Sequence, residues 1–382
     1  MTRSFPQMKR LALWSGTLTL TGLLVGCTQT IPKELVEAVE SIDQNLTHLR
    51  AAEFAPKEYA RFASRLMTLR VKAEAEEDVI HWPWESNELE LALLQLKEEG
   101  THTLERLTEH QERLRHSAEQ RLASVEERAK LINAQVDAIE GRLVLEGKPV
   151  EADLLIKQAR AFYDQGRYEQ SLEVSNRASL NLETQAVVLN RELGRYASPD
   201  RINHWRQMAQ QTINWSKQHH ASAIVVSKAE RTITLYNNGQ KVLSYPVKLG
   251  FNGIKEKRYQ GDGATPEGRY HVSEKRGQGQ TQFYRALALN YPNREDRRRF
   301  SHDRKTGHIP IRRSIGGQIE IHGVESELMA QTLGCVMLEN PHMAALFNRV
   351  RKGTPVTIVG TLHEQNAVAL ALSRLALGQE ET

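Results

Sequence analysis

Apolar side chains recur every three or four residues through most of the first half of the chain, between charged and polar ones. This spacing places them on one face of a helix. Two runs illustrate it: Leu91, Leu94, Leu96, Leu104 and Leu107, and then Leu122, Val125, Ala129, Ile132 and Val136. Glycine is rare here, and Pro56, Pro83 and Pro149 favour breaks between helices. Residues 31–196 are therefore predicted to be helical.

The pattern changes near residues 197–200, which read Ala-Ser-Pro-Asp. From Ala221, runs rich in β-branched residues predict strands at 223–227, 232–236, 242–247 and 356–359. Asn238 and Gly239, between two of these runs, are a strong hairpin signal. The chain is therefore expected to be an α+β multidomain protein. An N-terminal all-α helical bundle or short repeat array precedes a β-dominated domain.

One helical stretch suggests a repeat. Residues 159–172 resemble a single tetratricopeptide-like hairpin in which Gly166 turns the chain between two helices. A degenerate copy is conceivable around residues 55–59. A repeat array needs about three copies, so a plain bundle explains the helical half at least as well.

The N-terminus has the form of an export signal. Basic Arg3, Lys9 and Arg10 precede an apolar run at 11–25, which is too short for a comfortable membrane span. The run ends in Leu-Val-Gly-Cys at residues 24–27, which resembles a bacterial lipobox. The resemblance implies cleavage before Cys27 and lipidation of its thiol, enough lipid for stable anchoring. The alternative is an ordinary signal peptide with an incidental cysteine.

We therefore expect an exported protein, lipid-anchored at the periplasmic face of a membrane. Thr28 rather than aspartate follows the cysteine, which favours the outer membrane in a diderm organism. Five parts are predicted: signal peptide 1–26, helical domain 27–198, linker or helix 199–220, β-dominated domain 221–360 and C-terminal tail 361–382. The formal net charge of +4 and the absence of a recognisable nucleic-acid motif favour no nucleic-acid partner.

Cys335 is the candidate nucleophile. The chain has two cysteines, and lipidation of Cys27 would leave Cys335 without a disulfide partner. His322 follows the apolar run 318–321, a predicted strand, and is a candidate base for this thiol. Gly334 allows a tight turn and a close approach of backbone amides. The alternative is a buried structural cysteine.

The other histidines near this segment are His302, His308 and His342. Only His322 combines a strand end with a following glycine. No metal-ligand spacing stands out, so neither a metal nor another cofactor is expected.

Several separated motifs resemble the L,D-transpeptidase catalytic domain, also called YkuD, over residues 221–360. Residues 257–270 are similar to its Gly-Asp…Thr-Pro-Glu-Gly-x-Tyr signature, and 290–293 with Asp296 to a branch of the family. Residues 321–323, Ile-His-Gly, and 332–335, Thr-Leu-Gly-Cys, match the active-site pair. Residues 353–356 match the closing strand.

The resemblance implies a cysteine-dependent enzyme of cell-wall remodelling. Cys335 would attack a peptidoglycan stem peptide, release its terminal D-alanine and pass the thioester acyl group to an amine. His322 would serve as general acid and base. Backbone amides of residues 333–335 would form the oxyanion hole, with Gly323 and Thr332 shaping the loop.

Two departures from the family pattern concern substrate placement. Leu333 stands where most members have histidine, and Met337 where they have arginine. Arg312 or Arg313, just before the Gly316–Gly317 turn, is a candidate replacement that would bind a stem-peptide carboxylate through paired hydrogen bonds. Three functions remain open: an L,D-transpeptidase; an L,D-carboxypeptidase or an amidase that releases wall-linked protein; and a decayed wall-binding lipoprotein whose helical domain recruits a partner.

Overall fold

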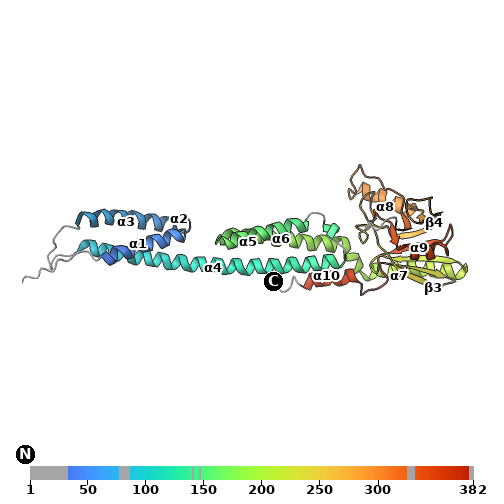
Figure 1. The fold of residues 1–382 in the computed structure, drawn as a ribbon, viewed down its shortest axis with the longest axis horizontal. Coiled ribbons are helices and arrows are strands. Elements are labelled where there is room, and N and C mark those ends of the chain that lie inside the picture. The colour runs from blue at the N-terminus through green and yellow to red at the C-terminus, as the bar shows by residue number, and fades with distance from the viewer. Residues whose placement is uncertain (1–32, 77–86, 140–141, 146–147, 325–331, 378–382) are drawn as a thin grey trace, which may run out of the picture. The chain divides into compact units, whose positions relative to one another are not determined.

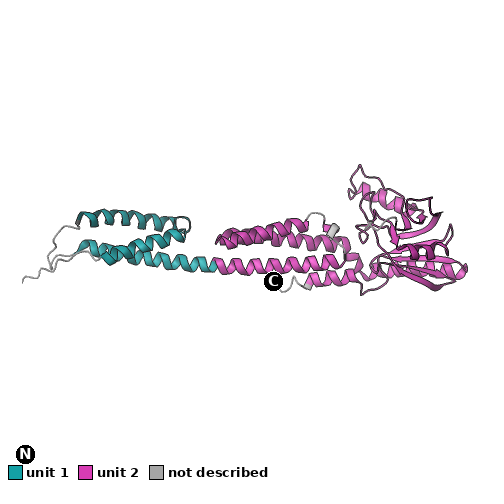
Figure 2. Ribbon diagram, viewed as in Figure 1, with its two compact units in different colours: residues 1–113 teal, residues 114–382 magenta. Residues whose placement is uncertain are grey.

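The computed structural model describes residues 33–76, 87–139, 142–145, 148–324 and 332–377. The predicted leader, Cys27 and Pro83 lie outside these residues. The chain divides into two compact units, Met1–Arg113 and Leu114–Thr382 (Figure 2). The boundary falls inside α4 (Glu88–Ala138), a single helix of 51 residues.

The first unit contains α1 (Lys33–His48), α2 (Ala51–Phe54), α3 (Pro56–Glu76) and the beginning of α4. The helical prediction is correct here, and Leu96 and Leu107 of the predicted apolar face of α4 are buried, but the start of that face was misplaced. Leu93 and Leu96 are buried, whereas Leu91 and Leu94 are 57% and 45% exposed. The 3.6-residue period admits either assignment when leucines occur at neighbouring positions, and packing against α1 and α3 selects one.

The helices of the second unit include the expected hairpin. α5 (Lys148–Asp164) and α6 (Tyr168–Leu193) lie side by side (Figure 1). Gly166 between them has a φ of 71°, the left-handed conformation in which glycine ends a helix without steric cost. The remaining part of α4 and the short η1 (Arg142–Leu145) share a buried core with this hairpin.

Two elements join the hairpin to the β-domain. Helix η2 (Gly194–Tyr196) follows α6 directly, and α7 (Pro199–Gln218) begins after the Ser198 cap. The predicted linker is thus a helix. Trp205 of α7 packs on Gly360, where an added Cβ would lie 2.3 Å from the indole ring. The core of α4–α7 also includes Ile254 and Val359 of the β-domain.

The β-domain is built on an eight-stranded sheet with the order β3-β2-β1-β8-β4-β5-β6-β7. Its strands are β1 (Ser222–Ser227), β2 (Thr232–Asn237), β3 (Gln240–Pro246), β4 (Gly268–Arg276), β5 (Ala286–Leu289), β6 (Glu320–Gly323), β7 (Val336–Leu338) and β8 (Pro355–Val359). The β1–β8 and β6–β7 pairs are parallel, and the other pairs are antiparallel. The α+β class is confirmed.

The predicted hairpin is present between β2 and β3. Asn238 and Gly239 have φ values of 53° and 77°, as a type I′ turn requires. Helices α8 (Arg294–Lys305) and α9 (Asn340–Phe347) belong to the β-domain, and α10 (Ala367–Leu377) lies in the predicted C-terminal tail. None of the helices in the described ranges is both long and apolar enough to span a membrane.

Candidate active site

A cavity of about 610 Å³ opens where β6 and β7 meet three loops. Its walls come from residues 257–261, 276–283, 316–322 and 332–335. Both predicted catalytic side chains, Cys335 and His322, line it. Residues far apart in sequence thus converge on one hollow, as a substrate site requires.

The parallel pairing of β6 and β7 places the thiol. Ile321 pairs with Val336, so Cys335, one residue before β7, lies beside Glu320. The backbone N–H of Glu320 donates to Cys335 Sγ at 3.4 Å, and the thiol lies 3.5 Å from the carbonyl oxygen of Gln318. Burial raises the pKa of Cys335 to about 11, with the Glu320 carboxylate adding to the rise and Lys257 opposing it. The resting cysteine is therefore a thiol.

His322 is fully buried in the middle of its ladder and stacks on Phe283, with ring centroids 3.7 Å apart. Its Nδ1 lies 2.8 Å from the carbonyl oxygen of Gly323. A carbonyl can only accept, so Nδ1 carries the proton and Nε2 keeps its lone pair. Nε2 is buried and has no hydrogen-bond partner among the described residues.

Burial lowers the pKa of His322, partly offset by the hydrogen bond to Gly323. A buried imidazole that is neutral, fixed in one tautomer and free at Nε2 suits a general base. Because the pKa of His322 is lowered and that of Cys335 is raised, both groups are uncharged at rest. The rival histidines lie outside the cavity lining: His302 and His308 are exposed, and His342 stacks on Tyr245.

The loop before Cys335 is held by its own threonine. Thr332 Oγ1 donates to the carbonyl oxygen of Cys335 at 2.9 Å and accepts from the N–H of Gly334 at 3.3 Å. The N–H of Gly334 is thus engaged within the loop. Among the described residues, the structure records no acceptor for the N–H of Cys335, so this amide is the better candidate oxyanion donor.

Gly334 must be glycine for two reasons. Its φ is 131°, and an added Cβ would lie 2.7 Å from the carbonyl oxygen of Ala264. Leu333 is 74% exposed at the cavity wall. Gly323 is also closely packed, since a Cβ there would lie 2.6 Å from Asn340 Oδ1. A nearby backbone carbonyl thus explains Gly334, and the side chains of Asn340 and Tyr284 explain Gly323.

The charged groups at the cavity differ from those expected. Arg312 and Arg313 are exposed and do not line it, and the Arg313 guanidinium lies 5.4 Å from the ring centroid of Tyr259. Arg276 and Lys257 line it instead. Met337, which stands where the family has arginine, is 2% exposed and pairs with His322 across β6 and β7.

Arg276 forms an ion pair with Glu320, with Nη1 and Oε1 2.6 Å apart. It also donates two hydrogen bonds to Glu274. Burial raises the pKa of Glu320, which the positive charge of Arg276 partly opposes. Glu320 lines the cavity, and within the described residues no hydrogen bond to its Oε2 is recorded.

Sequence reasoning missed Arg276, Lys257 and Phe283. Arg276 reaches the cavity through strand register, since it pairs with Ala286, and Ala286 pairs with His322. No local signal marks that alignment. For Lys257 the sequence did hold a clue, since this residue lies within the stretch that contains the Gly-Asp motif. The aspartate of that motif, Asp262, accepts a hydrogen bond from Lys257 Nζ at 2.6 Å and from three backbone N–H groups.

Comparison with protein families agrees with this geometry. Residues 221–358 match the YkuD family, described as the L,D-transpeptidase catalytic domain. The chain contains a YkuD domain. The match spans the sheet from β1 to β8 and includes every residue that lines the cavity. No curated protein sequence matches the chain significantly.

Solved structures similar to the chain are L,D-transpeptidases. One from Enterococcus faecium is 16% identical, covering 36% of this chain and 49% of its own, with a TM-score of 0.24. L,D-transpeptidase 1 of Mycobacterium tuberculosis is 21% identical, covering 37% and 62%, with a TM-score of 0.21. One from Mycobacterium smegmatis is 16% identical, covering 36% and 58%, with a TM-score of 0.22. The chain thus spans about half to three fifths of their lengths.

No cluster of three or more histidine, cysteine, aspartate or glutamate side chains that could hold a metal ion occurs in the part of the chain that the structure describes.

Proposed function

We propose that the protein is a cysteine-dependent L,D-transpeptidase that remodels peptidoglycan. The observation that supports this most strongly is the pairing of a buried His322, with Nε2 unpartnered, and the Cys335 thiol in one cavity of a YkuD domain. A lone pair held without a partner is costly in a folded protein, and its retention is typical of a group that acts in chemistry.

The proposed reaction proceeds in two steps. Nε2 of His322 takes the proton of Cys335 as Sγ bonds to the carbonyl carbon of a stem peptide. The peptide C–N bond then breaks, and the departing D-alanine amine takes the proton from His322. In the second step an amine of another stem attacks the thioester, and the proton passes back through His322 to Sγ. Water in place of the amine would give hydrolysis.

The resting protonation states suit this sequence. Because the pKa of Cys335 is about 11 and that of His322 is lowered, the proton moves only when a substrate carbonyl is present to receive the thiolate. The developing oxyanion would be met by the N–H of Cys335, a contribution of about 3 kcal/mol in comparable sites.

Arg276 and Glu320 supply the charges that a stem peptide would meet. Arg276 is 37% exposed at its side chain and can offer a guanidinium edge to a carboxylate. The free Oε2 of Glu320 can accept from an ammonium group. We assign to Arg276 the substrate-binding role that was expected of Arg312 or Arg313.

The test uses purified muropeptides and mass spectrometry. The wild-type protein should release D-alanine and form crosslinked dimers, with one acyl adduct on Cys335 in intact-mass spectra. Cys335→Ala should abolish both, while Cys335→Ser controls for packing at the site. If only hydrolysed products form, the hydrolase is favoured. If neither an adduct nor a product forms, a wall-binding protein is favoured.

We also propose export and lipid anchoring through Cys27, on the strength of the N-terminal pattern alone. Cell fractionation should find the mature protein in membranes. Cys27→Ser should move it to soluble or unprocessed forms, whereas Cys335→Ser should leave its location unchanged. A wild-type protein recovered wholly soluble would refute the anchor.

A further inference from the structure

A buried charge cluster links the end of α6 to the loop beneath the nucleophile. Arg195 of η2 donates from Nη1 to Glu267 Oε2 and from Nη2 to the carbonyl oxygen of Ile254, both at 2.7 Å. The neighbouring Tyr196 hydroxyl donates to the same carbonyl at 2.8 Å. The side chains of Arg195 and Glu267 are 14% and 7% exposed, and Tyr196 is fully buried.

Lys228 completes the cluster from the turn after β1. Its ammonium group is fully buried and donates to Glu267 Oε1, to the carbonyl oxygen of Lys255 and to that of Thr265, at 2.7 to 2.8 Å. Lys255 and Thr265 lie near the two ends of the 254–265 loop. One ammonium group therefore clamps both ends of the loop, and Glu267 carries that clamp to Arg195.

The same loop supports the nucleophile directly. The carbonyl oxygen of Ala264 lies where a Cβ of Gly334 would stand, one residue before Cys335. Thr265 Oγ1 accepts from the N–H of Gly250 at 3.1 Å. The next amide along, that of Phe251, donates to the carbonyl oxygen of Thr332 at 2.9 Å. The cysteine loop is thus packed on a segment that the clamp holds.

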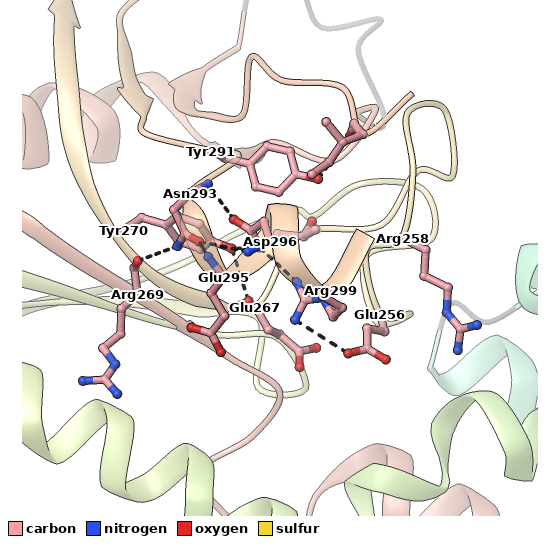
Figure 3. A network of polar contacts seen from close by, with 12 residues as sticks. Glu256, Arg258, Glu267, Arg269, Tyr270, Tyr291, Asn293, Glu295, Asp296 and Arg299 are labelled. Atoms are coloured by element: carbon pink, nitrogen blue, oxygen red, sulfur yellow. Dashed lines mark hydrogen bonds and ion pairs between the residues drawn. The ribbon is translucent and has the colours of Figure 1, made fainter. Parts of the chain in front are cut away.

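A second network anchors the strand that follows. Tyr270 donates to the carbonyl oxygen of Glu267 and to Asp296 Oδ1, and Arg299 pairs with Asp296 and with Glu256 (Figure 3). Glu256 of this network also pairs with Arg201 of α7, at 3.6 Å. Among the described residues, Arg195 and Tyr196 make the hydrogen bonds from the helical region to Ile254 and Glu267. A second longer ion pair, Glu192–Lys255 at 3.9 Å, also reaches the loop.

Resting on the function proposed above, we infer that Arg195 is a positioning residue for Cys335. The helical region, through η2, sets the geometry of the nucleophile loop by way of Glu267 and the Lys228 clamp. The end of α6 and η2 are then a structural part of the active site.

The test compares variants of the full chain. Arg195→Met removes the link, and Arg195→Lys keeps the charge but loses the two-pronged contact. Arg206→Met is the matched control, because Arg206 of α7 also makes long-range hydrogen bonds, to the carbonyl oxygen of Leu362 and to Glu364 in the segment after β8, away from the loop. Two readouts are taken: carbapenem acylation of Cys335 by intact mass, and the pH dependence of its alkylation by iodoacetamide.

The two readouts should move in opposite directions. A displaced cysteine loop should slow acylation by about tenfold or more, since small misplacements are costly. A loosened loop admits water to the thiol, so the alkylation midpoint should fall by about one pH unit or more toward the ordinary cysteine value. The groups facing the thiol are Glu320, Lys257 and His322, and none is changed. Arg195→Lys should be intermediate, and Arg206→Met should match wild type in both.

Acylation of Arg195→Met at the rate of Arg206→Met would overturn the inference. If Arg195→Met does not fold, Arg195→Lys and Tyr196→Phe decide by the same two readouts. If the wild-type protein is not acylated at all, the proposed function fails, but the alkylation profile still decides this inference. An Arg195→Met profile identical to that of Arg206→Met would then refute it.

Discussion

Two charged clusters in the second unit, residues 114–382, have opposite character. In the cluster of Arg195, Lys228 and Glu267, both carboxylate oxygens are bonded and the ammonium group makes three hydrogen bonds. In the pair of Arg276 and Glu320, both of which line the cavity, no hydrogen bond to one of the carboxylate oxygens is recorded among the described residues. A saturated buried cluster holds structure, and an unsaturated one beside a cavity is available to a ligand.

The ammonium nitrogen of Lys228 and Nε2 of His322 differ in the same way, one with all its hydrogen bonds made and the other with none recorded in the described part of the chain. The ammonium nitrogen of Lys228 is fully committed, whereas Nε2 of His322 has no partner among the described residues. Unsatisfied buried atoms need an explanation, and the proton transfer proposed from the Cys335 thiol in the same cavity would supply one. The comparison therefore suggests that Lys228 supports the fold and that His322 takes part in the reaction. Each assignment can be tested by substitution.

The largest expected effect is on stability. Glu267→Ala would leave Arg195 and Lys228 as buried cations without their carboxylate, which typically costs about 3–5 kcal/mol. Denaturant unfolding should show this loss, whereas Glu274→Ala, at an exposed carboxylate, should cost far less. A Glu267→Ala protein as stable as wild type would mean that the cluster supports nothing.

Acid should act through the same carboxylate. Burial alone would raise the pKa of Glu267. The positive charges of Arg195 and Lys228 instead hold that pKa at about 2, below its ordinary value of 4.5. A depressed folded-state pKa gives stability that is present above about pH 4.5 and lost as the pH falls toward 2. Unfolding measured across this window should show the loss in wild type, and a smaller slope in Glu267→Gln.

The next effect is on rate. His322→Ala should leave a folded protein whose acylation is slower by about a hundredfold or more, because the base is lost. His342→Ala is the control, since that ring stacks on Tyr245 outside the cavity lining. Equal acylation rates in the two variants would remove His322 from the mechanism.

The smallest effect concerns Glu320. Its charge contributes to the raised pKa of Cys335, so Glu320→Gln should lower that pKa. Wild-type alkylation should remain slow at neutral pH and rise toward pH 11, and the variant profile should lie at lower pH. Glu274→Gln, which removes a charge bonded to Arg276 but not facing the thiol, should change the profile less. Coincident profiles would show that Glu320 does not act on the thiol.

The sequence predicted those features that leave a local pattern. The helical half, the Asn238–Gly239 hairpin, the strand that carries His322 and the glycine before Cys335 are all marked by neighbouring residues. That Cys335 and His322 share one cavity was also expected, although their roles stay predictions. The domain boundaries likewise stay predictions.

What the sequence did not reveal depends on register and burial. Arg276 reaches the cavity only through two strand pairings, and Arg195 meets Glu267 across 72 positions of chain. Lys228, in a basic turn, was indistinguishable from surface charge. The substitution of Met337 for arginine suggested a replacement nearby in sequence, at Arg312 or Arg313, whereas the role is here proposed for Arg276, which reaches the cavity from β4.

Lys228 also provides a built-in reporter of local opening. With no exposed surface and its hydrogens committed, its amine cannot meet an acylating reagent while the clamp is closed. Its labelling rate, compared with that of an exposed lysine, would therefore measure how often this part of the fold opens. Such local openings differ in free energy from global unfolding. The labelling rate of Lys228 therefore reports how often the 254–265 loop is released from this lysine.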